Sequence, residues 1–211
     1  LLELPHKITR QELTQILPQE KQALESIYSS HDEPEGGYEV RKVCLFGLAE
    51  CSRGEVCAEF LKSGEIDKFG RLMYLSHDGD RVTKHTPDGK ILPWEYDVTD
   101  EQLVKLTSEA MRGEPDARLY LQPGGYGCSC EELDLIVDLA KTVPGVMGAG
   151  LTGAGLGGCV LVLVKEDSAE NLIDVLNKNY YYKKDLPSGC EICTSVDGAS
   201  FFTTNNPNQE D

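Results

Sequence analysis

The sequence of 211 residues contains no apolar run close to the roughly eighteen residues that a membrane-spanning helix needs. It also lacks a positively charged and then apolar leader, so no secretory signal is expected, and its start at Leu-Leu-Glu suggests a fragment or a processed chain. Positive charge is scarce, because 20 Lys and Arg face 36 Asp and Glu, for a net charge of −16. Nucleic acids and anionic membranes are therefore not expected as partners. Phosphate ligands stay possible, since backbone amides and a metal ion can hold an anion locally.

The eight cysteines lack the spacing of a metal site or a disulfide framework. Cys190 and Cys193 have the Cys-x-x-Cys spacing of a redox motif or half a zinc site, but no second pair stands at a zinc-ribbon distance. Cys128 and Cys130 are one residue too close. A chain of this length can bury a core without disulfides. We therefore expect no bound metal in this chain and a reducing, cytoplasmic location.

The N-terminal third has the apolar spacing of helices joined by short connections. Thr9 followed by Glu12 is typical of a capping box, and Pro18 should end that helix. A long apolar stripe then ends at Ser63-Gly64, a typical helix stop. The expected helices cover residues 10–17, 19–30, 38–62 and 66–77.

The remaining sequence predicts a mixture of helices and strands. Thr86-Pro-Asp-Gly89 indicates a hairpin turn, and Ser129 is a candidate cap for a helix ending at Lys141. The expected order is a helix at 99–112, a short strand at 118–122, a helix at 129–141, two strands around a glycine loop, a helix at 168–179, strands at 191–196 and 199–203, and a disordered tail at 205–211. This order predicts one α+β domain over residues 1–204, with an antiparallel sheet covered on one face by helices.

Glycine crowds into one short stretch between two apolar segments, at positions 148, 150, 153, 155, 157 and 158. Such density is tolerated where the backbone needs positive φ or where another group comes close. Residues 153–158 also match Gly-x-Gly-x-x-Gly, but that dinucleotide motif needs a helix after the last glycine. Here Cys-Val-Leu-Val-Leu-Val follows, which is typical of a buried strand. The sequence therefore predicts a hairpin whose loop either lies against phosphate or a phosphate-binding loop, or is a tight turn without a ligand.

Three ordered motifs resemble the galactokinase branch of the GHMP small-molecule kinases. Gly148–Cys159 resembles the third signature of the family, with Leu156 where Phe or Trp is usual. Cys128–Asp134 is similar to its Ser-Cys-x-Glu-Leu-Asp segment, and Phe69–His77 to its Phe-Gly-x-Leu-Met-x-x-Ser-His segment. Leu4–Leu13 resembles a stretch from the middle of such enzymes. The resemblance covers most of the chain and implies the ferredoxin-like GHMP C-terminal domain with a helical N-terminal part.

Two departures from the family pattern limit this resemblance. An insertion at about 78–127 separates the Ser-His segment from the Ser-Cys segment, which leaves the identity of the sugar open. The sugar-binding signature of the N-terminal half, the Gly-Leu-Ser-Ser-Ser nucleotide loop and the catalytic Asp do not occur in these 211 residues. The chain therefore resembles only the C-terminal half of such a kinase, and we expect no catalytic residue in it.

The resemblance implies transfer of the γ-phosphoryl group of ATP to the anomeric hydroxyl of a galactose-related sugar. ATP and Mg²⁺ would be bound mainly by the other half of the enzyme, whose nucleotide loop packs against the third signature. The residues that would take part are Thr152, Gly153, Ala154, Gly155, Leu156, Gly157 and Gly158. Ser76 and His77 are candidates for the substrate cleft, although a histidine at a helix end also suits the helix dipole. The alternative is a stand-alone, non-catalytic sensor or partner-binding module.

Overall fold

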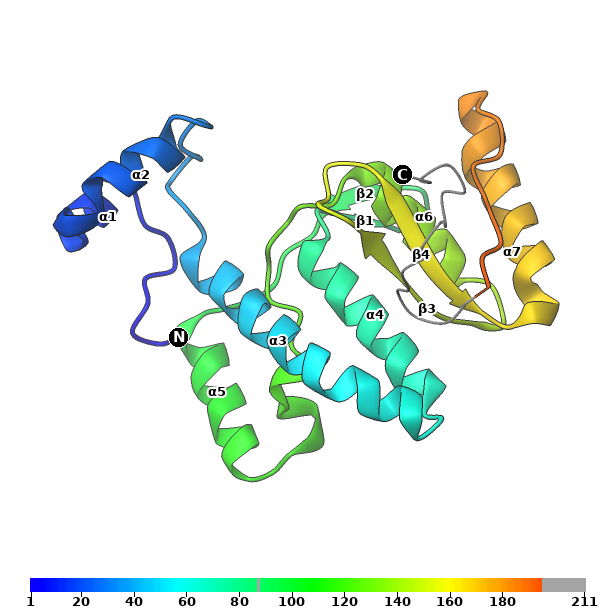
Figure 1. Ribbon diagram of the computed structural model, residues 1–211, viewed down its shortest axis with the longest axis horizontal. Helices are drawn as coiled ribbons and strands as arrows, with labels where there is room; N and C mark the ends of the chain where they lie inside the picture. The colour runs from blue at the N-terminus through cyan, green and yellow to red at the C-terminus, as the bar shows by residue number, and fades with distance from the viewer. Residues whose placement is uncertain (87, 195–211) are drawn as a thin grey trace, which may run out of the picture.

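The computed structural model describes residues 1–86 and 88–194, and in this part the chain is of the α+β class (Figure 1). The helices are α1 (Arg10–Ile16), α2 (Lys21–Tyr28), α3 (Val40–Lys62), α4 (Ile66–Asp80), α5 (Asp100–Met111), α6 (Glu131–Lys141) and α7 (Ala169–Leu176). The strands form two antiparallel pairs, β1 (Thr83–His85) with β2 (Ile91–Pro93) and β3 (Val146–Thr152) with β4 (Cys159–Val164). Among the described residues, no helix has the length and apolarity required to cross a bilayer.

The N-terminal helices lie within about three residues of the predicted bounds, and α4 continues to Asp80 instead of ending at His77. The capping box of α1 is present, because the Thr9 N–H donates to the Glu12 carboxylate at 2.8 Å and the Glu12 N–H donates to Thr9 Oγ1 at 3.2 Å. After α3, Gly64 takes a φ of +73°, which stops the helix. One predicted helix, at 19–30, is divided into a 3-10 turn at Pro18–Glu20 and α2.

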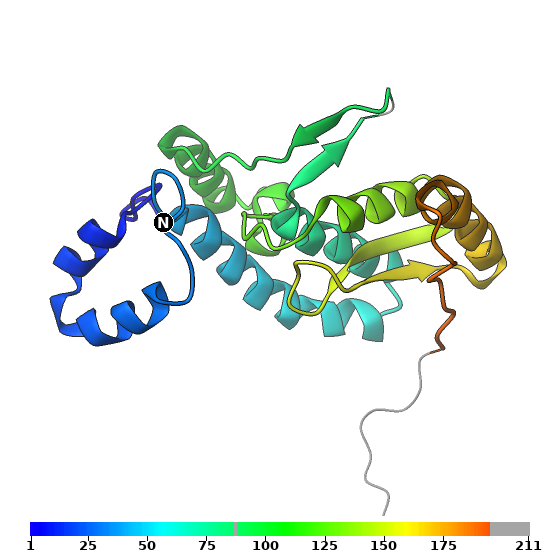
Figure 2. The same ribbon diagram turned by 90° about the horizontal axis from the view of Figure 1, so that it is seen from above.

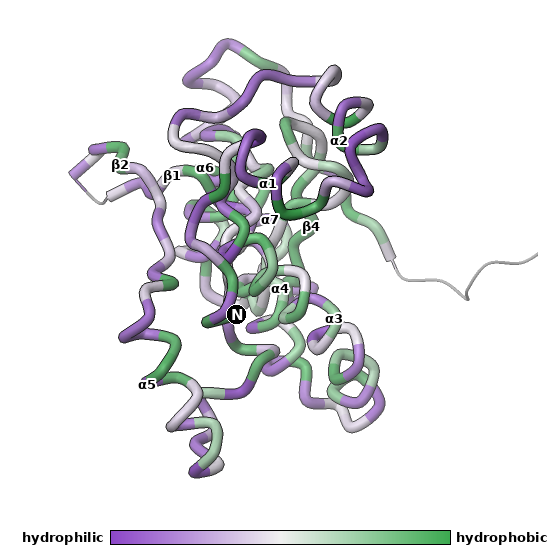
Figure 3. Tube along the Cα trace, turned by 90° about the vertical axis from the view of Figure 1, so that its left-hand side faces the viewer, coloured by the Kyte–Doolittle hydropathy of each residue, from purple (hydrophilic) through white to green (hydrophobic). Residues whose placement is uncertain are grey.

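The β3–β4 hairpin lies at the centre of the C-terminal part, with α4 alongside β3 and with α6 and α7 packed on one face (Figure 1). The most buried members of this core are Val137, Ala140, Val143, Ala149, Leu172 and Leu176. β4 is apolar along its whole length (Figure 3), and Val160, Val162 and Val164 pack against the same core. The alternation of strand side chains thus supplies one wall of the core, and the helices supply the other.

The predicted insertion forms the β1–β2 hairpin, α5 and two 3-10 turns. The β1–β2 hairpin extends away from the body of the molecule (Figure 2). Its base is anchored by Trp94, whose indole N–H donates to the backbone oxygen of Asp78 at 2.8 Å. The predicted turn at Thr86–Gly89 lies at its tip, where the N–H of Gly89 donates to the oxygen of Thr86.

Three sequence-based expectations differ from the structure. The strand expected at 118–122 is instead a 3-10 helix, Leu119–Leu121, because the guanidinium of Arg53 rather than a neighbouring strand binds the carbonyls of Tyr120 and Gln122. Ser129 does not cap α6: Cys130 is the N-cap, and the Ser129 hydroxyl donates to Asp134 instead. Residues 191–194, expected to begin a strand, have no regular secondary structure. The rest of that strand, the strand at 199–203 and the tail at 205–211 lie outside the described residues.

Candidate functional site

The glycine loop connects two strands, as the sequence predicts. Thr152 at the end of β3 pairs with Cys159 at the start of β4, so residues 153–158 form the turn of an antiparallel hairpin. A dinucleotide-binding loop would need a helix after Gly158, and β4 stands there instead. The fold therefore excludes a dinucleotide-binding loop at residues 153–158.

Four glycines of the loop adopt positive φ, which explains why glycine is needed there. The values are +97° at Gly153, +84° at Gly155, +121° at Gly157 and +102° at Gly158. Leu156 also has a φ of 59°, and 86% of its surface is exposed. A Cβ at position 153 or 157 would meet no atom within 4 Å, so the loop has free space beside its backbone where a ligand can approach.

Cys128 contacts the backbone of the glycine loop. Its backbone oxygen accepts a hydrogen bond from the Leu156 N–H at 2.6 Å. A Cβ on Gly155 would lie 2.2 Å from that oxygen and 2.6 Å from Cys128 Sγ, so only glycine fits against this support. The segment that resembles Ser-Cys-x-Glu-Leu-Asp therefore begins with the residue that packs against the loop.

The Cys128 thiol is not a nucleophile in this setting. Burial raises its pKa to about 12, together with the hydrogen bond that Sγ donates to Asp80 Oδ1 at 3.0 Å. Burial likewise raises the pKa of Asp80. A thiol that stays protonated near neutral pH acts here as a hydrogen-bond donor to Asp80 and not as a reactive group.

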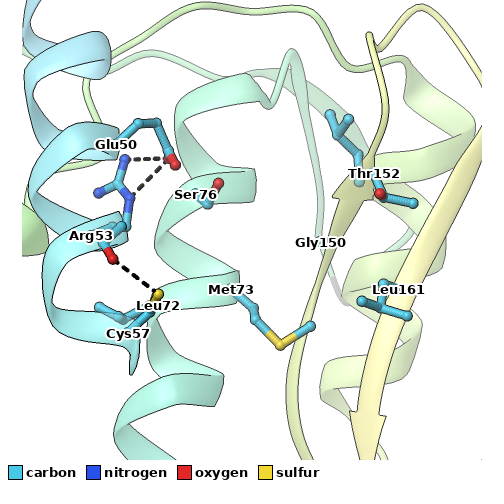
Figure 4. Close-up of a pocket in the computed structure, with 11 residues that line it drawn as sticks. Glu50, Arg53, Cys57, Leu72, Met73, Ser76, Gly150, Thr152 and Leu161 are labelled. Carbon is cyan, nitrogen blue, oxygen red and sulfur yellow. Dashed lines mark hydrogen bonds and ion pairs between the residues drawn. The ribbon is translucent and has the colours of Figure 1, made fainter. Parts of the chain in front are cut away.

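Ser76 lines a cavity of about 290 Å³ that reaches the base of the glycine loop (Figure 4). The cavity lies between α3, α4 and the β3–β4 hairpin, and Thr152 belongs to its wall. The remaining lining residues are Glu50, Arg53, Gly54, Cys57, Leu72, Met73, Gly150, Leu151 and Leu161. The predicted cleft residue Ser76 and the predicted loop residue Thr152 therefore border the same space.

The cationic side chain in this cavity wall is already neutralised. Arg53 is 4% exposed, and its Nε and Nη2 donate to Glu50 Oε1 at 2.8 and 2.6 Å. Its Nη1 donates to the carbonyls of Tyr120 and Gln122. Arg53 thus holds the 3-10 segment on α3, and its charge is balanced by Glu50 before any anion arrives.

His77 does not line this cavity and is only 1% exposed. Its Nδ1 accepts the Leu151 N–H at 3.3 Å, which places the ring proton on Nε2. Nε2 lies 3.2 Å from Oδ1 of Asp134. His77 therefore connects β3 to α6, and of the two predicted cleft residues Ser76 is the one beside open space.

Asp134, which contacts His77 and Ser129, is a residue that the sequence analysis did not select as a site candidate. Its carboxylate is completely buried, yet it accepts hydrogen bonds from Ser129 Oγ at 2.6 Å, from the N–H groups of Val82 and Thr83 at 3.0 and 2.8 Å, and from Thr83 Oγ1 at 3.0 Å. Burial alone would raise the pKa of this carboxyl, but contacts with His77, Ser129, Thr83 and Val82 outweigh burial and hold it at about 2. The only sequence signal was that Asp134 and His77 each end a motif resembling the same family.

The pKa of Asp134 predicts how its contribution to stability depends on pH. A carboxyl whose pKa is lowered by folding stabilises the native state fully above its unfolded pKa, and this stabilisation is lost as pH falls toward the folded pKa. We expect this group to account for a loss on the order of 2 kcal/mol in the free energy of unfolding between about pH 4 and pH 2. Urea unfolding of wild type and Asp134→Asn across that range measures it. The difference between the two proteins should shrink as the pH falls, and a constant difference would contradict the assignment.

Within residues 1–86 and 88–194, no group of three or more His, Cys, Asp or Glu side chains is arranged to hold a metal ion.

Comparison with known proteins agrees with this geometry. The family described as GHMP kinases C terminal matches residues 100–182, which run from the start of α5 through the hairpin and α7. The chain carries a GHMP kinase C-terminal domain. It is 35% identical over 177 residues to a galactokinase of Actinobacillus pleuropneumoniae, a match that covers 80% of this chain and 43% of that protein.

Two further galactokinases support the same assignment. The protein of Thermosipho africanus is 45% identical over 123 residues, 58% of this chain and 30% of that protein. The protein of Exiguobacterium sibiricum is 27% identical over 152 residues, 72% of this chain and 28% of that protein. The matched part of this chain therefore spans less than half the length of each of these three relatives.

Proposed function

We propose that this chain is the C-terminal part of an ATP-dependent sugar 1-kinase, which transfers the γ-phosphoryl group of ATP to the anomeric hydroxyl of a galactose-related sugar. The observation that carries the proposal is the glycine loop, held open between two strands in a domain of the GHMP kinase family. The galactokinase names of its relatives suggest the substrate.

The loop fits a phosphate group or a phosphate-binding neighbour. Gly153 and Gly157 leave space that a Cβ would otherwise fill, so a phosphate group can approach the loop backbone closely there. Residues 152–158 would border the phosphates of ATP, while ATP and Mg²⁺ would supply the transferred group and neutralise its charge. The loop offers backbone and no positive side chain, because Thr152–Gly158 contains neither Lys nor Arg.

This lack of positive charge predicts that the chain does not work alone. A triphosphate needs cations or Mg²⁺ to offset its charge, and Arg53 in the neighbouring cavity is paired with Glu50. The acidic net charge of −16 adds repulsion. We therefore propose that the nucleotide loop, the Mg²⁺ site and the catalytic base lie in a separate N-terminal half. How the insertion at 78–127 influences the choice of sugar stays a prediction.

A direct comparison of two purified proteins tests the proposal. The 211-residue chain is expected to release no ADP above background with any sugar in a panel of free hexoses. The longer protein, expressed from the extended reading frame, should phosphorylate galactose or a close relative. NMR of the product identifies which hydroxyl of the sugar was phosphorylated, and the anomeric hydroxyl is expected. Robust turnover by the 211-residue chain would contradict the division of labour, and an inactive longer protein would contradict the kinase.

The second candidate function is a non-catalytic sensor or partner-binding module derived from a sugar kinase. It would fit the lack of a positive side chain in Thr152–Gly158 and the pairing of Arg53 with Glu50. The reading frame upstream separates the two: a Gly-Leu-Ser-Ser-Ser loop within about two hundred residues favours the enzyme, given the length of such domains, whereas a start codon close to Leu1 favours the module.

A further inference from the structure

The backbone of the loop that carries the proposed function has little intrinsic conformational restriction, because of its glycine content. Four of its residues are glycines at positive φ, and Leu156 at its apex is mostly exposed. Glycine has the largest conformational freedom to lose on ordering. A loop of this composition keeps one position only if contacts outside the loop hold it.

One such contact is at the end of β3. β3 pairs with β4 along one edge, and among the described residues it has no strand partner on the other edge. The N–H of Leu151 faces this open edge and donates to Nδ1 of His77. An N–H buried at such an edge needs an acceptor, and the imidazole supplies it immediately before the loop begins.

The second contact is at the loop apex, where the Leu156 N–H donates to the Cys128 oxygen. Cys128 is held in place by its neighbour Ser129, whose N–H donates to the oxygen of Asp80 at 2.8 Å. The Ser129 hydroxyl donates to Oδ1 of Asp134 at 2.6 Å. The position of the apex therefore depends on Asp134 through Ser129 and Cys128.

Both contacts meet at one carboxylate. Oδ1 of Asp134 faces the His77 ring at 3.2 Å and accepts from Ser129, while Oδ2 holds the turn after α4 through Val82 and Thr83. We propose that Asp134 is a positioning residue, which sets the base of the glycine loop through His77–Leu151 and its apex through Ser129–Cys128–Leu156. The kinetic part of this inference rests on the proposed function of the loop, and the structural part does not.

Matched variants separate the two paths. Ser129→Ala removes the path to the apex and leaves His77 in place. His77→Gln keeps an N–H donor near the position of Nε2 but places no acceptor at the position of Nδ1, where the Leu151 N–H donates. Asp134→Asn keeps the size of the side chain but places an amide N–H₂ against donors, which disturbs both paths. Val137→Ala, a truncation in the core on the same helix, is the control for general loss of stability.

NMR of the 211-residue chain measures both ends of the loop. In Ser129→Ala we expect the backbone order parameter of Leu156 to fall from roughly 0.85 to below about 0.6, with Leu151 unchanged. In His77→Gln we expect the Leu151 amide to exchange at least about tenfold faster relative to the other β3 amides. Asp134→Asn should show both effects, and Val137→Ala should raise exchange evenly with neither local effect. If Asp134→Asn does not fold, the two single-path variants still decide.

The positioning role is overturned if Ser129→Ala and His77→Gln merely reproduce the even response of Val137→Ala, or leave both amides at wild-type values. Kinetics of the longer protein give an independent answer. We expect Ser129→Ala to raise KM for ATP by about tenfold while changing KM for the sugar by less than about twofold, as loss of a loop position should do. Local NMR effects with unchanged kinetics would leave Asp134 as the positioning residue and would instead refute the proposed role of the loop.

Discussion

Gly155→Val in the longer protein is expected to lower kcat/KM for phosphoryl transfer by at least about a hundredfold, which is the effect of a displacement near 1 Å at a reacting group. The physical reason is twofold. Gly155 has a φ of +84°, and any Cβ there would stand 2.2 Å from the backbone oxygen of Cys128. A branched side chain must therefore push the loop away from its support. Steady-state kinetics with ATP and the preferred sugar measure the loss.

Gly64→Val is the matched control for Gly155→Val. Gly64 also has positive φ, at +73°, but a Cβ there would meet no atom within 4 Å, and it ends α3 far from the loop along the chain. The strain is similar, and the displacement is absent. We expect this variant to keep kcat/KM within about twofold at a temperature where it is folded. Wild-type kinetics for Gly155→Val would show that the loop is a plain hairpin turn.

Gly70→Ala is expected to have the largest effect on stability, a loss of about 3 kcal/mol or more in the free energy of unfolding. Gly70 lies on the face of α4 against β3, and a Cβ at this position would lie 2.1 Å from the backbone oxygen of Met147. The obstacle is backbone and cannot rotate away, so α4 and β3 would have to separate. For a chain of this size, that loss corresponds to a fall in melting temperature of roughly 6 to 12 °C.

Gly47→Ala provides the opposite expectation in the neighbouring helix. Gly47 is exposed in the middle of α3, and a Cβ there would meet nothing within 4 Å. Replacing a glycine in an exposed helix interior should stabilise the protein by roughly 0.5 to 1 kcal/mol. Thermal unfolding of the two variants side by side tests the close approach. Equal melting temperatures would mean that α4 and β3 are not packed backbone to backbone.

The sequence predicted the elements whose causes are local. The capping box of Thr9 and Glu12, the stop at Gly64 and the glycine loop between two apolar strands depend on residues within a few positions of one another. The strand after Gly158 was readable because β-branched residues in an unbroken apolar run favour a strand. The same local information was enough to reject a dinucleotide-binding loop, whereas the GHMP kinase family was indicated by the resemblance of three motifs to known members.

Local information failed where a distant side chain replaced the expected partner. The strand expected at 118–122 had the right composition, but Arg53 binds its carbonyls from a position 67 residues away from Tyr120. Ser129 had the right residue type for a helix cap, but Cys130 occupies the cap position and the Ser129 hydroxyl donates to the buried carboxylate of Asp134. In both cases a charged group buried by packing is the stronger hydrogen-bonding partner.

The sequence by itself determined that this chain has a glycine loop between two apolar strands, since backbone freedom and an unbroken apolar run are properties of neighbouring residues. The structure leaves part of the second strand exposed, including Leu161, where the sequence predicted a buried strand. Only the tertiary structure decided what holds that loop. His77 and Leu151 are 74 residues apart, and Asp134 and Thr83 are 51 apart, so their contacts exist only after α4, α6 and β3 have packed together. Burial then makes the Asp134 carboxylate the acceptor for Val82, Thr83 and Ser129, and His77 the acceptor for Leu151, because a buried donor must find a partner.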